Sequence, residues 1–392
     1  ILDDGRERVG IVSCDLLGFS DEFDQQLRQK IAATGAIKAD NVMIACTHNH
    51  AGPATQFLRN CGTVNEEWMA ALRRSIIEVV KQAANALRAV TVEYSWGRAN
   101  LNHNRRFFST NANSTRKQGE RNTRVSIVQF KSGRDVTANL LHYACHPVTM
   151  LWENRMLSSE YCGQACSLLE AATGAPALFL NGACGDVNPL IADNAGKLSP
   201  VTEYSGRNYE DVVQFGGTIA RVATRALQRR ECITAPNLHV EMQRVAVPLR
   251  VPEESEVEAA LRSHRSSLKA AYLSETERWI HSTYFDWAQQ AKAAMQSGAA
   301  PRSTLVSLQK IFIGNLSLVG VSGELFAAIG KRIQKLVGDP CLVVGYANGN
   351  VGYLPTRNSF SKGGYEVEDA GRLYGLFGVG IHTESTLLKQ FR

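Results

Sequence analysis

Several common signatures are missing from this sequence of 392 residues. No apolar run approaches the about 18 residues of a membrane-spanning helix, so we expect no membrane span. The patterns GxGxxG, Walker A and GxSxG are absent, which leaves a dinucleotide site, a phosphate-binding loop and an α/β-hydrolase serine unsupported. There is no Cys-x-x-Cys pair, and the nine cysteines are scattered and odd in number, which indicates a reducing compartment.

Repeats, low-complexity tracts and linkers rich in proline or serine are absent as well. At about 100–200 residues per domain the length allows two or three domains. Because no linker divides the chain, we predict one domain over residues 1–392. Residue 1 is Ile, so an N-terminal segment is expected to be missing. A cytoplasmic location is predicted, and a periplasmic or secreted one stays open.

The charge balance gives little support to a nucleic-acid partner. The chain has 43 Lys and Arg against 37 Asp and Glu, a net charge of +6. Its densest basic stretches, Arg98–Arg124 and Arg221–Arg230, contain no RNP, zinc-finger or helix-turn-helix pattern. The sequence therefore predicts a soluble protein with no nucleic-acid partner.

Strand and helix patterns alternate along the chain. Short apolar runs predict strands at 9–17, 42–46, 177–181 and 341–346, and Ser132-Gly133 and Gly314-Asn315 predict hairpin turns. Amphipathic patterns predict helices at 21–34, 162–172, 216–230 and 324–337, and a capping box at Thr63 predicts the start of another. The charged segment Pro252–Ala299 predicts an inserted helical pair. The fold class is thus α/β: a mixed β-sheet with helices on both faces and hairpin interruptions.

Polar residues follow several predicted strands at their carboxyl ends, where ligands gather in open α/β sheets. They are His48-Asn49-His50, Cys145-His146-Pro147, Cys184-Gly185-Asp186 and Gly352-Tyr353, with Gly323-Glu324 at a strand-to-helix junction. Side chains two apart on an extended backbone point the same way. His48 and His50 can therefore bind the same metal ion, or one can bind the metal while the other contacts the substrate. The residues alone leave structural roles open as alternatives. The histidines can be structural, Glu324 can be a charge at a helix start, and Tyr353 can be a core aromatic.

The segment Thr47–Pro53 reads THNHAGP, which is similar to the T-H-T-H-S-G-P motif of the neutral/alkaline non-lysosomal ceramidase family. His146-Pro147 resembles the H-P pair of that family. Further likenesses follow in the family's order over nearly the whole chain: Asn104-Arg105, Asn154–Leu169, Gly185–Pro189, Gly323-Glu324, Tyr353–Thr356 and Tyr365-Glu366. The ordered set, more than any one motif, makes the resemblance specific.

The resemblance implies a zinc ion with four protein ligands: His48, His146, Glu324 and Tyr353. It implies that three further residues face the substrate carbonyl: His50, Arg105 and Tyr365. The expected reaction is hydrolysis of a C–N amide bond in a small-molecule substrate by a metal-activated water. An ester- or lactone-cleaving enzyme with the same site, and a non-catalytic binding member of the family, stay open as alternatives.

Two departures from the family pattern bear on the substrate. Asn188 stands where the family carries the serine of G-D-V-S-P, and an amide cannot act as a nucleophile. The chain ends at Arg392, which leaves no room for the β-sandwich domain that follows in ceramidases. We therefore expect a substrate smaller or more polar than ceramide. The segments Pro252–Ala299 and Asn358–Gly364 are candidates for a lid or for a subunit contact in a homo-oligomer.

Overall fold

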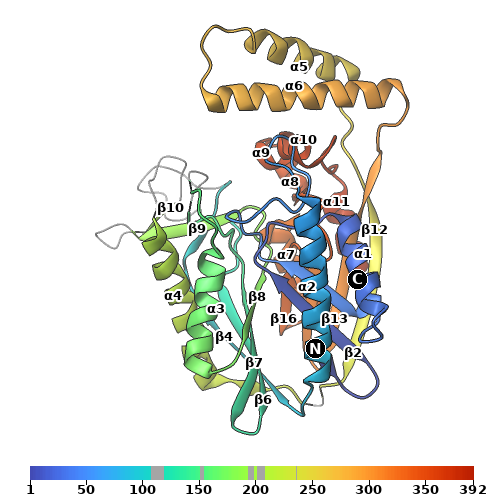
Figure 1. Cartoon of the computed structure of the whole chain (residues 1–392). Helices are drawn as coiled ribbons and strands as arrows, with labels where there is room; N and C mark the ends of the chain where they lie inside the picture. Colours follow the sequence, from blue (N-terminus) through green and yellow to red (C-terminus); the bar gives the residue numbers. More distant parts are fainter. Residues whose placement is uncertain (107–118, 151–153, 193–197, 201–207, 235) are drawn as a thin grey trace.

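Two mixed β-sheets pack against each other at the centre of the molecule (Figure 1). The computed structural model describes residues 1–106, 119–150, 154–192, 198–200, 208–234 and 236–392. The first sheet has, in spatial order, β11 (Glu231–Cys232), β4 (Thr91–Arg98), β6 (Arg124–Ser132), β7 (Asp135–Tyr143) and β8 (Ala177–Asn181). The second has β12 (Leu238–Pro248), β13 (Ser303–Ile313), β14 (Leu316–Val321) and β16 (Cys341–Val344). Neighbouring strands are antiparallel, except that β8 runs parallel to β7 and β16 runs parallel to β14.

The alternation of side chains along the strands explains this layering. Successive residues of a strand point to opposite faces, and in the inner strands of the two sheets both faces are apolar. In the first sheet, Val128 and Leu140 lie in the cluster between the two sheets, whereas their neighbours Ile127 and Leu141 lie in a cluster with the helices outside. Each sheet therefore has one face on the other sheet and one face on helices, since a face left uncovered would expose apolar surface to water.

Helices cover the outer faces. The helices α3 (Glu160–Thr173) and α4 (Tyr209–Ala226) pack on the first sheet, and α7 (Ala327–Val337) and α11 (Thr383–Leu388) pack on the second. The helices α1 (Asp21–Ala32) and α2 (Glu66–Asn85) pack on a third sheet, whose strands are β1 (Leu2–Asp3), β2 (Arg8–Cys14) and β3 (Val42–Cys46). Three 3-10 turns, η1 (Ala39–Asn41), η2 (Leu227–Arg229) and η3 (Lys389–Phe391), lie at element ends.

Short elements surround the carboxyl ends of the central strands. The strands β5 (Asn102–Asn104), β9 (Val187–Ala192) and β10 (Leu198–Pro200) form one small sheet. The strands β15 (Glu324–Leu325) and β17 (Tyr353–Leu354) form a parallel pair. The short helices α8 (Arg357–Phe360), α9 (Tyr365–Glu368) and α10 (Ala370–Tyr374) follow β17.

The predicted helical insertion is present as α5 (Glu254–Ser267) and α6 (Glu275–Gln296). Figure 1 shows the pair beyond α8, α9 and α10, away from the central sheets. Its contact with the body includes an apolar cluster, in which Val257, Trp287, Ala288 and Ala291 are buried together with Phe377. Within the described residues, no helix is both long enough and apolar enough to cross a bilayer.

The structure confirms the α/β class and corrects three details. The strands form several sheets and not one, because both faces of the central strands are apolar. The capping box at Thr63 was wrong: Asn65 caps α2, and its side chain accepts the Trp68 N–H. Glu324 does not begin a helix, since it pairs with Tyr353 in the β15–β17 ladder and α7 begins at Ala327.

Candidate metal centre

The carboxyl ends of strands from three sheets meet at one place. The Tyr346 N–H donates to the carbonyl of Gly323, and the Cys46 N–H donates to the carbonyl of Tyr346. These bonds join the segments after β14, β16 and β3. The loop after β8 closes the arrangement: the Gly185 N–H donates to the Leu325 carbonyl at 2.9 Å. A side chain at Gly185 would place its Cβ 2.3 Å from the Glu324 carbonyl oxygen, so only glycine permits this approach.

His48 and His146 are buried and have the same hydrogen-bond arrangement. The Nδ1 atom of His48 lies 2.8 Å from the Leu17 carbonyl oxygen, and the Nδ1 atom of His146 lies 2.7 Å from the Cys184 carbonyl oxygen. A carbonyl only accepts, so each Nδ1 carries the hydrogen. In a neutral ring this leaves the Nε2 atom with a free lone pair, which is the form that binds metals.

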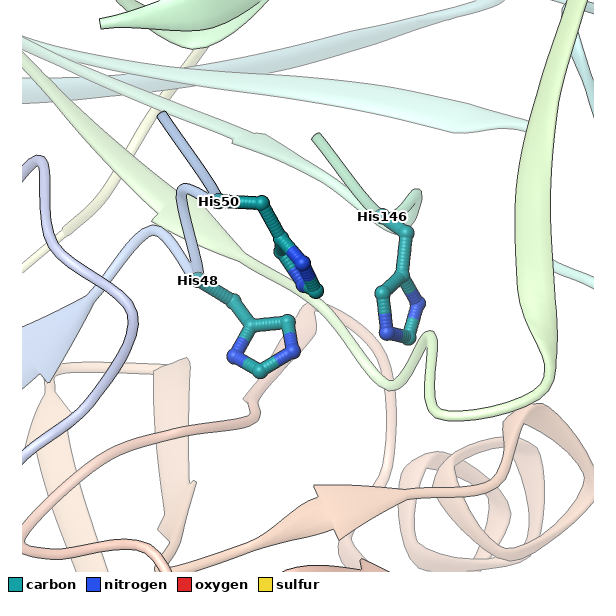
Figure 2. A group of neighbouring side chains, drawn as sticks. All are labelled: His48, His50 and His146. Atoms are coloured by element: carbon teal, nitrogen blue, oxygen red, sulfur yellow. The ribbon is translucent and has the colours of Figure 1, made fainter. Parts of the chain in front are cut away.

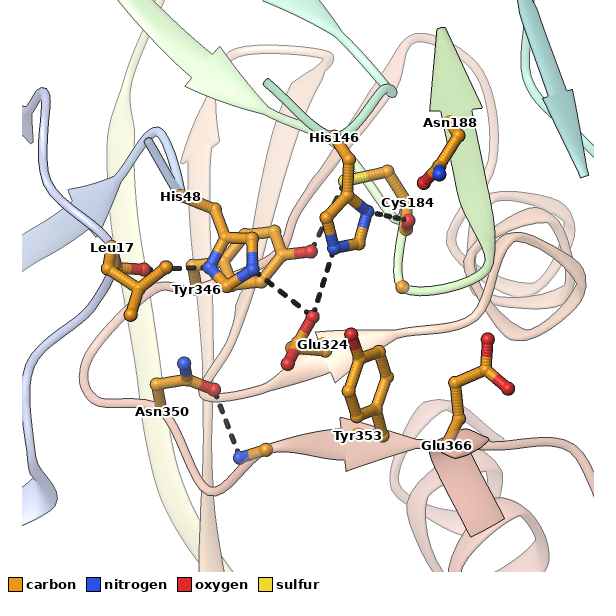
Figure 3. A network of polar contacts seen from close by, with 12 residues as sticks. Leu17, His48, His146, Cys184, Asn188, Glu324, Tyr346, Asn350, Tyr353 and Glu366 are labelled. Carbon is orange, nitrogen blue, oxygen red and sulfur yellow. Dashed lines mark hydrogen bonds and ion pairs between the residues drawn. The ribbon is translucent and has the colours of Figure 1, made fainter. Parts of the chain in front are cut away.

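Both Nε2 atoms face one carboxylate oxygen. The Oε2 atom of Glu324 lies 3.2 Å from the Nε2 of His48 and 3.2 Å from the Nε2 of His146 (Figure 3). Its Oε1 atom accepts a hydrogen bond of 2.6 Å from the Tyr374 hydroxyl. Glu324 is fully enclosed by protein. Three side chains from distant parts of the sequence thus direct their ligand atoms at a common point.

His50 adds a third imidazole from the exposed side. Its ring centroid lies 4.8 Å from that of His48 and 6.0 Å from that of His146. The three rings lie around a common space in Figure 2, and one ring nitrogen from each lies within 4.8 Å of the other two. His50 itself is exposed, in contrast to the two buried histidines. It is therefore the imidazole that solvent or a substrate can reach.

Tyr353 and Arg105 lie beside this group. Tyr353 is the register partner of Glu324 in the β15–β17 pair, so the two side chains leave neighbouring backbone positions. The Nη2 atom of Arg105 donates to the Tyr353 hydroxyl at 3.1 Å and to the Gly185 carbonyl at 3.0 Å. Its Nε donates to Glu366 at 2.8 Å, and its Nη1 donates to the Asn188 Oδ1 at 3.1 Å. Four of the five guanidinium N–H groups are thereby engaged.

Tyr365 lies at the outer edge of the site. Its ring packs edge-on against Tyr353 with the centroids 5.8 Å apart, and 44% of its surface is exposed. Asn188 is half-buried and directs its amide oxygen at Arg105. Glu366 accepts hydrogen bonds from both Arg105 and Arg106, which holds the start of α9 against the site.

The environment fixes the protonation states of the buried groups. Burial lowers the pKa of His146 to about 4, so the ring is neutral at pH 7. Burial alone would raise the pKa of Glu324, but His48 and His146 hold that pKa well below its usual range. Although His50 reaches solvent, the protein packed around its ring and the neighbouring His48 also lower its pKa. Neutral imidazoles and an ionised carboxylate are the states in which these groups bind metals.

This arrangement fits a bound cation. The Nε2 atoms of His48 and His146 and an ionised oxygen of Glu324 converge, and in neutral rings no hydrogen lies between them, because the ring hydrogens are on the Nδ1 atoms. Three acceptors in contact repel one another unless a positive charge lies among them. Without a metal, a second proton on one ring supplies that charge, and this is how the histidines lower the pKa of Glu324. Two imidazoles and a carboxylate are a ligand set that zinc accepts. The fixed Nδ1–H···O=C bonds are the usual outer support of metal-binding histidines.

The structure brings the seven predicted site residues into one region, but their roles as ligands or catalytic groups stay predictions. One argument from the sequence was wrong: the backbone at His48 is not extended, since its φ of 65° lies in the left-handed region. His48 and His50 are neighbours because of this turn. A residue other than glycine with positive φ is strained, and such strain is common at functional sites.

Two residues of the site were missed. Tyr346 stacks on His48 with the ring centroids 4.0 Å apart, and Tyr374 binds Glu324. Tyr346 lies at the end of the predicted strand 341–346. The rule that ligands gather at the carboxyl ends of strands, which pointed to His48, could therefore have indicated Tyr346 too. For Tyr374 the sequence carries no signal, because its contact with Glu324 joins positions 50 residues apart.

Comparison with known proteins supports the family resemblance. Residues 1–213 match the sequence model of the neutral/alkaline non-lysosomal ceramidase family, N-terminal domain. This match covers more than half of the chain, and the chain belongs to this family. Its fold is similar to the crystal structure of neutral ceramidase from Pseudomonas aeruginosa, with a TM-score of 0.69, 19% identity and coverage of 97% of this chain.

A second similar structure is a ceramidase complexed with C2, with a TM-score of 0.69, 17% identity and coverage of 99% of this chain. At these identities the comparison shows the fold alone. This chain spans 65% of the first ceramidase and 67% of the second.

Proposed function

We propose that the chain is a zinc-dependent hydrolase that cleaves a C–N amide bond by a metal-activated water. The observation that carries this proposal is the convergence of the His48 and His146 Nε2 atoms on one Glu324 oxygen. His48, His146, Glu324 and Tyr353 would hold the ion. A zinc ion in such a site lowers the pKa of a water molecule to about 7 and polarises a carbonyl group.

His50 is suited to proton transfer. It is exposed, it lies against the two buried histidines, and its lowered pKa means that it is neutral at pH 7. A neutral imidazole accepts a proton from an attacking water and returns it to a departing amine. The exposed Tyr365 hydroxyl can donate a hydrogen bond to the oxygen of the substrate carbonyl as negative charge develops there.

Arg105 acts mainly through its neighbours. Four of its N–H groups are bound to Glu366, Asn188, Gly185 and Tyr353, which leaves one for a substrate. Its positive charge is permanent, since the nearby Tyr353 and Glu366 raise its pKa against the effect of burial. The guanidinium therefore orients the Tyr353 phenol and adds positive charge beside the reacting carbonyl.

A substrate smaller or more polar than ceramide fits the groups at the open side of the site. His50, Tyr365, Asn188 and Arg105 all present polar atoms there, and a polar amide would use them as hydrogen-bond partners. The same groups would also serve an ester or a lactone. Matched amide and ester versions of one acyl group therefore belong in the activity panel, and faster turnover of the amide relative to its uncatalysed rate would favour the amidase.

The test combines metal analysis with one variant and one control. The chain should bind about one zinc ion, and His48→Ala should abolish both that binding and amide hydrolysis. His142→Gln is the matched control, because His142 is a buried histidine whose Nε2 meets the Val343 carbonyl and takes no part in the site. Full activity in a metal-free preparation would refute the proposal, and so would zinc binding by His48→Ala equal to that of the control.

A further inference from the structure

The helix α10 touches both the metal centre and the helical insert. At its end, the Tyr374 hydroxyl donates to Glu324 Oε1 at 2.6 Å. Two residues earlier, the Arg372 guanidinium carbon lies 4.5 Å from the Trp287 ring centroid and 5.2 Å from the Tyr284 ring centroid, both on α6. Cations over aromatic faces are attracted by the ring electrons. One short helix thus connects α6 to a residue of the metal centre.

The segment after α10 is attached to the insert as well. The Trp287 Nε1 donates to the Leu376 carbonyl at 2.6 Å, and Trp287 and Phe377 belong to the same buried apolar cluster. From the other side, Arg59 donates from Nε to the Arg372 carbonyl and from Nη2 to the Gly375 carbonyl. The backbone of residues 372–377 is therefore positioned by the insert and by the loop around Arg59.

Tyr374 itself has little freedom. Its ring lies on Gly352, where an added Cβ would come 3.0 Å from the ring, and it packs edge-on against Tyr353 with centroids 6.4 Å apart. The position of its hydroxyl consequently follows the position of α10. Because Glu324 Oε2 faces the two histidines, the contact of Oε1 with Tyr374 sets the rotation of the carboxylate.

We propose that Tyr374 and Arg372 are positioning residues through which the α5–α6 insert orients the carboxylate of Glu324 for metal binding. This inference rests on the proposed function in one respect, that Glu324 is a metal ligand. It assigns to the insert a role in the metal affinity of the site. Neither residue touches the expected substrate carbonyl, so both act through Glu324.

Zinc affinity of the full-length chain, measured by competition with a chelator, tests the proposal. Tyr374→Phe keeps the ring and removes only the hydroxyl, and it should weaken zinc binding about 10-fold, as other outer-shell substitutions do. Arg372→Ala should weaken binding as well, and Arg372→Lys should restore part of the loss. Arg262→Ala is the control: Arg262 is an exposed arginine on α5 with its own partner, Glu258, and it should leave the affinity unchanged.

The double variant separates positioning from general destabilisation. If Arg372 acts through Tyr374, adding Arg372→Ala to Tyr374→Phe should weaken zinc binding no further. Fully additive losses would overturn the proposal, and so would wild-type zinc affinity in Tyr374→Phe. Failure of the proposed function has a different signature, since His48→Ala would then bind zinc as tightly as the wild-type chain. That result would overturn both proposals at once.

Discussion

Replacing Glu324 by Gln should weaken metal binding strongly and lower metal-free stability only moderately. The substitution keeps the shape of the side chain and removes its charge. In the wild-type chain Glu324 Oε2 lies 3.2 Å from two imidazole Nε2 atoms. Glutamine can keep its oxygen on the Tyr374 hydroxyl and turn its NH2 group to the histidines. The histidines then face a neutral amide in place of the carboxylate charge.

The magnitudes follow from this geometry. Structural zinc sites with four ligands bind with about 10–16 kcal/mol, or about 3 kcal/mol per ligand, so losing the carboxylate should weaken zinc binding by roughly 100-fold or more. The metal-free protein should lose about 1–3 kcal/mol in its free energy of unfolding, because the histidines that hold the Glu324 pKa low lose their charged partner.

Two assays read these effects separately. Chelator competition gives the zinc dissociation constant, and urea unfolding of the metal-free protein gives the free energy of unfolding. Tyr374→Phe is a useful comparison, because it should weaken zinc binding without supplying a donor to the histidines. If Glu324→Gln bound zinc like the wild-type chain, Glu324 would be only a structural partner of the histidines and the metal site would be refuted.

Three further predictions test the surroundings of the site. Burial lowers the pKa of His142 to about 4. The unfolded chain therefore takes up a proton on His142 below pH 6.5 that the folded chain does not, and folded-state stability falls as the pH falls toward 4. About 1.4 kcal/mol of the free energy of unfolding should be lost by pH 5.5. His142→Gln should flatten that part of the pH dependence in urea unfolding, and an unchanged slope would contradict the assignment. In Arg105→Lys, the lysine cannot reach the four acceptors that Arg105 binds. The kcat/KM should therefore fall about 10-fold or more while the zinc content stays the same. A kcat/KM equal to that of the wild-type chain would exclude a role for the guanidinium. At a free zinc concentration of about 1,000 times the dissociation constant, the bound ion should contribute about 4 kcal/mol to the free energy of unfolding, and a chelator should remove this contribution. A melting temperature independent of zinc would argue against a bound ion.

Much of the fold could be predicted from local patterns. The strands Val42–Cys46 and Ala177–Asn181 have the predicted bounds. The second hairpin closes at the predicted Gly314-Asn315, and the first closes one residue later than predicted, at Gly133-Arg134. Runs of apolar residues and turn-forming pairs act over a few positions, so no tertiary information is needed to recognise them. The capping of α2 by Asn65 was missed because Thr63 and Glu66 satisfy the same local pattern two residues earlier.

The candidate site was only partly predictable. The residue types and their places after strands pointed to His48, His146 and Glu324, since carboxyl ends of parallel strands meet at one edge. The helix start expected at Glu324 was wrong. Glu324 pairs in a strand ladder with Tyr353, which lies 29 positions further along the chain, beyond any local pattern. The contact of Tyr374 with Glu324 depends in the same way on how α10 packs against the insert.

The amino-acid sequence by itself determined the elements, their apolar faces and the chemical groups at their ends, because propensity and periodicity act between near neighbours. Tertiary structure decided how those faces were shared between two packed sheets and which ring nitrogens met the carboxylate. A strand that is apolar on both faces can bury each face equally well against a helix or against a second sheet. Only the packing of distant segments distinguishes the two, and the same packing places three acceptors around one point.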